Sequence, residues 1–195
     1  FQGSWIYLKA ELAQWLLQDA WRRGGAAGHP SKPWPWADTV PLLRLQVPRL
    51  QVDAIVLAGD HGQALAFGPG HADASATPGR PGTALISGHR DTHFRFMREL
   101  RVGDRILIGL LSGRQLEYRV TGAEVVNADR IRIAAETEEQ LLLATCWPFD
   151  SPIPGGPLRY VAVAEPVSPA PVEVDKPVTT TALIIRKTDK IDTSA

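Results

Sequence analysis

Cysteine is almost absent from this 195-residue chain, which contains only Cys146. One thiol cannot form an internal disulfide, so no disulfide cross-link contributes to the fold, and the cysteine count does not resolve the redox compartment. A lone thiol is either a candidate nucleophile or a small, buried, inert side chain. The sequence around Cys146 is therefore needed to decide between these two interpretations.

Long apolar runs and a start methionine are also missing. No stretch of 18 or more apolar residues is present, so no segment is predicted to span a bilayer. Residues 1–4, Phe-Gln-Gly-Ser, resemble the scar left by a tag-cleaving protease. We therefore expect the natural N-terminus to be missing, together with any membrane anchor that preceded it.

An excess of charge of either sign is lacking as well, because Lys+Arg and Asp+Glu number 21 each. This balance gives no electrostatic footprint for nucleic acid or for an anionic membrane. We expect no nucleic-acid partner.

Apolar residues make up 44% of the chain, enough for a sizeable core, and the 17 Gly and 16 Pro indicate many turns. Apolar and polar residues alternate from residue 43 to 47, and the pattern resumes after Pro48. Further strands are expected at 83–89, 105–111, 115–126, 141–145 and 160–164, with a hairpin turn at Ser112-Gly113. Seven or eight short strands predict an all-β barrel or sandwich over residues 39–167.

The flanking segments have a different pattern. Apolar residues recur at helical spacing from Trp5 to Ala20, and Gly24-Gly25 should end this amphipathic helix. The helix packs on the domain, lies near a lipid surface, or does both. With the Gly/Pro/Trp-rich linker it forms a unit of residues 5–38, and short helical turns are expected within 64–82 and 92–100. Residues 168–195 are either disordered or add an edge strand.

Three strand-like runs end at or begin with a chemically useful side chain, namely His89, Cys146 and Arg159. A thiol attacks an acyl carbon as the thiolate, and its ordinary pKa near ~8.5 requires a neighbouring base or cation. Histidine, with a pKa near ~6.5, exchanges a proton in this range. Arginine offers a permanent charge and several N–H donors for an oxyanion. Spacing alone does not bring the three residues together.

A family resemblance connects them. Residues 82–94 (Gly-Thr-Ala-Leu-Ile-Ser-Gly-His-Arg-Asp-Thr-His-Phe) and 143–148 (Leu-Ala-Thr-Cys-Trp-Pro) resemble the two signature regions of sortases, the cysteine transpeptidases that attach proteins to cell surfaces. The family pattern places a His after one strand, a Thr-x-Thr-Cys-like element at the end of another, and an Arg on the next. Leu143 here replaces the first Thr of that element.

Residues 68–82 also resemble the run that precedes the His strand of the family, and the likeness covers roughly residues 43–165. The sequence Trp-Pro-Phe after the cysteine and the Trp-rich N-terminal helix look most like the Gram-negative branch, class GN. The resemblance implies an eight-stranded sortase-type β-barrel with an N-terminal helix and short connecting helices.

It also implies roles for particular residues. Cys146 would be the nucleophile, His89 the general acid/base, and Arg159 the oxyanion stabiliser. The residues expected to contribute to substrate binding are Thr145, Trp147, Pro148 and His71. The implied substrate is a sorting signal of the Leu-Pro-x-Thr-Gly kind, transferred through a thioester to an amine of unknown identity. The implied location is extracytoplasmic, anchored to the inner membrane and facing the periplasm or cell surface.

No cofactor or metal is expected, although two metal sites are conceivable. His71, His89 and His93 would suit zinc, but no fixed ligand spacing supports such a site. Glu136, Glu138 and Glu139 would suit the structural calcium of some sortases, and a solvated charged turn explains them equally well.

The sequence leaves three further questions open. Asp91 would orient His89 in a triad, although side chains two residues apart on a strand rarely meet head to head. The proline-rich loop 147–158 is predicted to form a stiff wall of a peptide groove, or else a plain surface loop. The rival functions are a thiol hydrolase on the same fold and a non-catalytic peptide-binding barrel with an inert Cys146.

Overall fold

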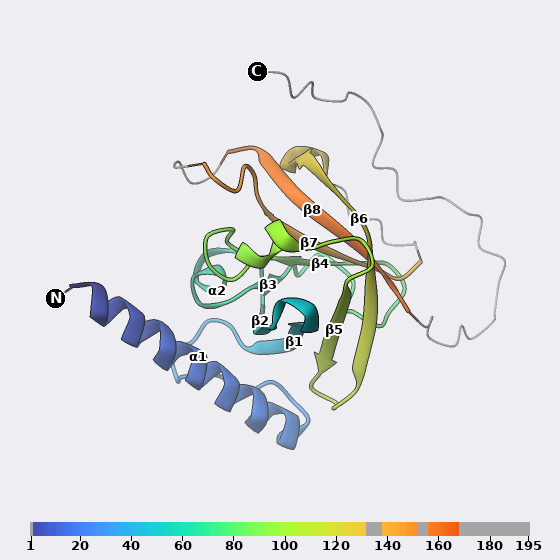
Figure 1. Ribbon diagram of the computed structural model, residues 1–195. Coiled ribbons are helices and arrows are strands. Elements are labelled where there is room, and N and C mark those ends of the chain that lie inside the picture. The colour runs from blue at the N-terminus through green and yellow to red at the C-terminus, as the bar shows by residue number, and fades with distance from the viewer. Residues whose placement is uncertain (1, 132–137, 152–155, 168–195) are drawn as a thin grey trace.

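A computed structural model of the chain describes residues 2–131, 138–151 and 156–167. Eight strands close into a barrel in the order β1-β2-β3-β4-β7-β8-β6-β5. A long N-terminal helix lies outside the barrel against its first two strands (Figure 1). The eight-stranded barrel with an N-terminal helix and short connecting helices is thereby confirmed.

The strands follow the predicted order along the chain. Their bounds are β1 Pro41–Val47, β2 Val52–Ala58, β3 Gly70–His71, β4 Thr83–Ser87, β5 Arg105–Leu110, β6 Gln115–Asn127, β7 Gln140–Cys146 and β8 Leu158–Pro166. The α-helices are α1 Gln2–Ala27 and α2 Gly62–Phe67, and the 3-10 turns are η1 Pro48–Leu50, η2 Arg95–Glu99 and η3 Ala128–Arg130.

The alternating pattern places the core inside the barrel. In β1 the side chains of Leu43, Leu45 and Val47 are buried, whereas Arg44 is exposed and forms an ion pair with Asp53 of β2. Burial of one face of each strand is the main driving force for closing such a barrel. The largest fully buried side chains of the main cluster include Tyr118, Phe94, Met97, Ile106, Ile108, Leu141 and Leu143.

Helix α1 packs on the domain, which is the first of the two arrangements that its pattern allowed. Leu17 and Ala20 are fully buried, and Leu17 joins an apolar cluster with Ile55 and Leu57 of β2. The side-chain amide of Gln14 donates a 2.9 Å hydrogen bond to the main-chain carbonyl of Phe67. Across the described residues, no helix combines the length and the apolarity that a membrane span requires.

The predicted end of this helix was wrong. It continues through Gly24 and Gly25 to Ala27 and ends before Gly28, whose φ of 75° lies in the left-handed region. A Cβ at Gly24 would lie 3.1 Å from the His29 carbonyl oxygen and 3.1 Å from Leu111 Cδ2. Gly24 therefore permits the main chain at His29 and the side chain of Leu111 to pack closely against the helix. The helix also begins at Gln2, before the predicted start at Trp5.

One strand was missed. β3 has only two residues, yet it pairs in parallel with β2 and antiparallel with β4, and so closes the barrel between them. A Cβ at Gly70 would fall 2.1 Å from the carbonyl oxygen of Gly59, so only glycine allows this approach of the two chain segments. Two residues are too few for a period to be read from sequence.

Candidate active site

The strand order brings the three predicted catalytic positions to one edge of the barrel. β4 and β7 are parallel neighbours with Ser87 opposite Ala144, and the main-chain N–H of Gly88 donates to the Ala144 carbonyl at 3.1 Å. His89 and Cys146 each lie two residues beyond this pair, so their main chains are adjacent. β8 flanks β7 on its other side, with Arg159 directly opposite Cys146.

Cys146 and Arg159 lie on the outward side of the barrel wall. Along β7, Leu141, Leu143 and Thr145 are buried, with both leucines in the main core, whereas Leu142 and Ala144 belong to a second apolar cluster. Cys146 continues the alternation of Leu142 and Ala144 and is partly exposed. Residues opposite each other in an antiparallel pair have side chains on the same face, so Arg159 shares the face of Cys146.

Arg159 is held by the loop that leads into its own strand. Its Nη1 donates hydrogen bonds of 2.7 Å to the Gly156 carbonyl and 2.9 Å to the Leu158 carbonyl. Two acceptors on one nitrogen orient the planar guanidinium, which carries five N–H donors in all. The guanidinium thus has a defined direction, on the residue of β8 that lies opposite Cys146.

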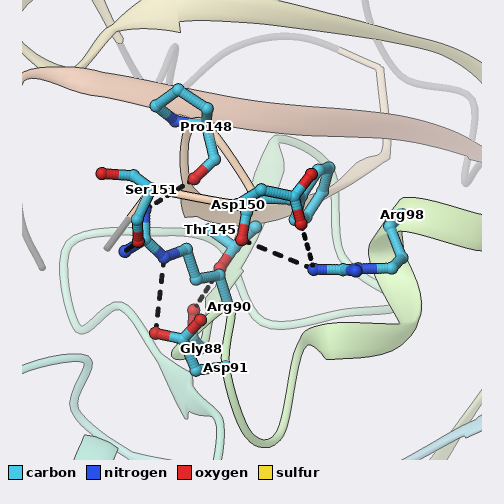
Figure 2. Close-up of polar contacts among 9 residues, drawn as sticks. Gly88, Arg90, Asp91, Arg98, Thr145, Pro148, Asp150 and Ser151 are labelled. Atoms are coloured by element: carbon cyan, nitrogen blue, oxygen red, sulfur yellow. Dashed lines mark hydrogen bonds and ion pairs between the residues drawn. The ribbon is translucent and has the colours of Figure 1, made fainter. Parts of the chain in front are cut away.

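Thr145 is a structural link between the neighbours of the two reactive residues. Its side chain is 2% exposed, and its hydroxyl donates a 2.7 Å hydrogen bond to the carbonyl of Gly88 (Figure 2). This bond joins the residue before Cys146 to the residue before His89. A direct contact of Thr145 with substrate stays a prediction.

A second imidazole lies close to His89. The main-chain N–H groups of Thr92 and Phe94 both donate to the His89 carbonyl, so the chain turns back at this point. Burial lowers the pKa of His93, and the nearby positive form of His89 lowers it further. The sequence pattern gave no sign that the His93 side chain is partly buried here.

The contact that the Asp91 carboxylate makes is with Arg90 and does not direct it toward His89. Its side chain is 65% exposed, and its Oδ2 lies 3.4 Å from Nε of Arg90. The ion pair with Arg90 gives no support to a triad of Asp91, His89 and Cys146.

His71 lies on β3, one strand farther from β7 than β4. Its ring is buried, with Nε2 2.9 Å from the Ala76 carbonyl oxygen and 3.2 Å from Oγ of Ser75. That serine oxygen also accepts a hydrogen bond from the main chain of Leu85 in β4. His71 therefore orders the loop between β3 and β4, and its role in substrate binding stays a prediction.

Neither conceivable metal site has a supporting geometry among residues 2–131, 138–151 and 156–167, because no group of three or more His, Cys, Asp or Glu there is arranged to hold an ion. Glu139 instead accepts hydrogen bonds from the Tyr118 hydroxyl and, at 2.9 Å, from the main-chain N–H of Gly79. Glu136 lies outside the described residues.

Aromatic side chains pack around the loop that follows Cys146. The ring of Trp147 lies 5.2 Å from that of Phe149 and stacks on Tyr160 at 5.9 Å, measured between centroids. Tyr160 is the residue of β8 opposite Thr145. Pro148 is exposed and contributes its carbonyl to a hydrogen bond from Arg90. Residues 152–155 of this predicted wall lie outside the described residues, so its stiffness stays a prediction.

A surface hollow of about 470 Å³ lies at the end of β2 and its neighbouring loops. The residues that line it are Asp38, Thr39, Ala58, Gly59, His61, Ala64 and Asp73. None of the three predicted catalytic residues is among them. The hollow therefore gives no support to the predicted role of Cys146.

Sequence reasoning missed one residue of the site, Arg90. It belongs to the motif around His89 but received no role of its own, yet its side chain is buried and bonded to the loop after Cys146. The sequence offered one signal, a charged residue directly after the predicted base. Nothing in the local pattern shows that this charge is buried.

Comparison with known proteins bears on the same region. The family model described as the Sortase domain matches residues 45–167. Sortase D from Bacillus subtilis (strain 168) is 32% identical over 126 residues, which cover 64% of this chain and 63% of that protein. The match thus spans less than two thirds of the relative's length.

Solved structures share the fold. A Sortase D5 transpeptidase from Clostridium perfringens aligns with a TM-score of 0.64 and 19% identity over 81% of this chain and 99% of its own. Sortase A from Corynebacterium diphtheriae aligns with a TM-score of 0.60 and 24% identity over 71% of this chain and 66% of its own. The class GN assignment stays a prediction. Because the family model covers most of the barrel that carries Cys146, His89 and Arg159, the chain belongs to the sortase family.

Proposed function

We propose that this protein is a cysteine transpeptidase that cleaves a sorting signal of the Leu-Pro-x-Thr-Gly kind and transfers the acyl part to an amine. The observation that carries the proposal is the pairing of Cys146 with Arg159 across β7 and β8, beside the end of β4 that leads to His89. Family membership supports the same chemistry.

In the proposed reaction Cys146 passes its thiol proton to His89 and, as the thiolate, attacks the threonine carbonyl carbon of the signal. The guanidinium of Arg159 donates hydrogen bonds to the oxyanion that forms, which stabilises the tetrahedral intermediate. The C–N bond to glycine breaks, His89 protonates the departing amine, and a thioester to Cys146 remains. The incoming amine then attacks the thioester, loses its proton to His89, and expels the thiolate as the new amide forms.

The location of the peptide is part of the proposal. Extended peptides bind across strand ends with alternate side chains in pockets. The apolar cluster of Leu142, Ala144, Leu85 and Val161 continues the face on which Cys146 lies. The substrate would approach this outward face, with Trp147 and Pro148 at its edge. The proposed place of action is extracytoplasmic, in a protein anchored to the inner membrane through a segment N-terminal to α1.

The proposed domain organisation assigns catalysis to residues 39–167 and leaves α1 and its linker as a separate supporting unit. The main-chain hydrogen bonds of the barrel lie within the first of these segments. Residues 168–195 lie outside the described residues, so both interpretations of the tail stay predictions.

Mass spectrometry tests the function directly. The protein is incubated with sorting-signal peptides, with and without a small primary amine, and quenched in acid. We expect an acyl adduct on Cys146 and, with the amine, an amide product that replaces the hydrolysis product. A Cys146→Ala variant is the matched control and should form neither.

The outcomes separate the rival functions. Adduct formation followed only by hydrolysis, whatever the amine, would identify a thiol hydrolase. Peptide binding without any adduct would identify a non-catalytic barrel. Full cleavage by Cys146→Ala would overturn the assignment of the nucleophile.

A further inference from the structure

Arg90 directly follows His89 and is buried, with only 3% of its surface exposed. Taking a guanidinium out of water is costly unless its N–H groups find acceptors. A buried arginine beside a proposed catalytic base is therefore held there by specific partners.

Those partners lie on the loop that follows Cys146. Nη1 of Arg90 donates a 2.6 Å hydrogen bond to the Pro148 carbonyl, and Nη2 donates a 2.7 Å hydrogen bond to the Ser151 carbonyl. Nε lies 3.4 Å from Oδ2 of Asp91. Figure 2 shows the guanidinium of Arg90 between Asp91 on one side and the residues Pro148 and Ser151 on the other. One planar group thus bridges two strand ends.

This bridge complements the bond between Thr145 and Gly88. Thr145 precedes Cys146 and is joined to Gly88, which precedes His89. Pro148, two residues after Cys146, is joined to Arg90, which follows His89. Residues on both sides of Cys146 are therefore hydrogen-bonded to residues on both sides of His89.

We propose that Arg90 is a positioning residue for acyl transfer, which holds the loop after Cys146 in register with the segment that carries His89. The inference rests on the proposed roles of Cys146 and His89. Arg90 donates to main-chain carbonyls of that loop, so it acts by fixing where the sulfur and the imidazole lie. Displacement of reacting groups by about 1 Å costs about 10²-fold in rate.

Lysine cannot replace arginine in this role. The bridge requires two N–H donors in one plane, spaced to reach two carbonyls three residues apart, and the guanidinium fork has this geometry. An ammonium group keeps the charge but is a compact point donor. Arg90→Lys therefore removes the bridge and leaves the local charge in place, which separates geometry from electrostatics.

Arg98 of η2 provides a matched control on the same loop. Its Nη2 lies 3.4 Å from the Phe149 carbonyl and 3.4 Å from Oδ1 of Asp150, whose side chain is 88% exposed. Exposed ion pairs of this kind contribute little to the stability of a protein. The two arginines contact one loop, but only Arg90 does so from a buried position.

The test compares Arg90→Lys, Arg90→Gln and Arg98→Lys with the native sequence. Steady-state kinetics with a Leu-Pro-x-Thr-Gly peptide are measured at a temperature where thermal unfolding curves show each protein folded. For both Arg90 variants we expect kcat to fall about 10²-fold with little change in KM. For Arg98→Lys we expect kcat within about twofold of native.

A second readout needs no substrate. The rate constant for alkylation of Cys146 by iodoacetamide is measured at one fixed pH near neutrality, since the thiolate is the reacting form. In both Arg90 variants this rate constant should fall, because the imidazole that accepts the thiol proton no longer holds its place beside the sulfur. A residue that only stabilises the fold would leave this rate constant unchanged in the folded variant.

The possible results are distinct. Native kcat and a native rate constant for alkylation in Arg90→Lys would overturn the inference, as would unfolding of both Arg90 variants at every assay temperature, which would assign Arg90 to folding alone. Cys146→Ala and His89→Ala, measured in parallel, report on the proposed function itself. If these two variants retain cleavage, the proposed function fails, whatever the Arg90 variants do.

Discussion

The hydroxyl of Thr145 donates a 2.7 Å hydrogen bond to the main-chain carbonyl of Gly88, and the bond is buried. It joins two parallel strands just before the residues that carry the proposed chemistry. The hydroxyl of Thr145 therefore links the two strand ends at this edge of the barrel.

Thr145→Val tests this link, because valine matches threonine in shape but has no hydroxyl. The Gly88 carbonyl then loses a buried donor, which should reduce the free energy of unfolding by about 1–3 kcal/mol. Urea unfolding measures the loss, and Thr145→Ser, which keeps the hydroxyl, should be closer to native. Equal stability of the valine variant and the native protein would contradict the structural role of the bond.

Arg159→Lys tests the oxyanion role. Lysine keeps the positive charge but not the planar set of N–H donors that Arg159 carries opposite Cys146 in the strand register, so kcat should fall about 10²–10³-fold. Arg159 is partly exposed, and its hydrogen bonds go only to the nearby main chain of Gly156 and Leu158, so the unfolding midpoint should change little. Turnover near the native rate would rule out the proposed role.

Gly88→Ala tests the packing behind His89. A Cβ at Gly88 would lie 2.6 Å from two ring carbons of the buried Phe94, so the ring or the main chain must move. Overpacking of this kind costs about 1–3 kcal/mol of stability, and peptide cleavage should fall with it, since the displaced segment carries His89.

Gly122→Ala is the matched control for that variant. Gly122 lies in β6, and a Cβ there would meet no heavy atom within 4 Å. Its unfolding midpoint should stay the same or rise slightly, because alanine restricts the unfolded chain more than glycine does. A larger loss for Gly122→Ala than for Gly88→Ala would refute the packing argument.

His93→Gln tests the pH dependence of stability. The pKa of His93 is lowered in the folded protein by burial and by the nearby His89, so the unfolded chain binds this proton more readily. Above pH about 6.5 the imidazole is neutral in the folded and the unfolded state, so it adds nothing to the pH dependence of the free energy of unfolding. As pH falls below about 6.5, the unfolded state takes up the proton first, and the free energy of unfolding decreases.

The measurement is urea unfolding at pH about 7.5 and about 5.5. The native protein should lose stability across this interval, and His93→Gln should lose less. Asp104 does not interfere in this pH range. The hydrogen bond from Arg49 lowers the pKa of Asp104, so its contribution to the free energy of unfolding is lost only below pH about 3.9. An identical pH dependence in both proteins would show that His93 titrates alike in the folded and unfolded states.

Much of the fold was predictable because its elements depend on local patterns. The alternation of Leu43, Leu45 and Val47 predicted β1 and its buried face, and Ser112-Gly113 marked the turn between β5 and β6. Two features were not predictable, because they depend on residues far away in the chain. Gly24 lies inside α1 with Leu111 packed against it, and β3 exists because β2 and β4 flank it.

For the candidate site, too, local sequence and tertiary structure decided different features. The sequence by itself determined which residues have reactive side chains and which strands they flank, and its family resemblance predicted that Cys146, His89 and Arg159 act together. Only the tertiary structure decided that β4, β7 and β8 are neighbours, that His93 lies close to His89, and that Arg90 is buried against the loop after Cys146. The physical reason is that side-chain periodicity is set by each strand alone, whereas strand order, burial of charge and hydrogen bonds between loops arise only when the barrel closes.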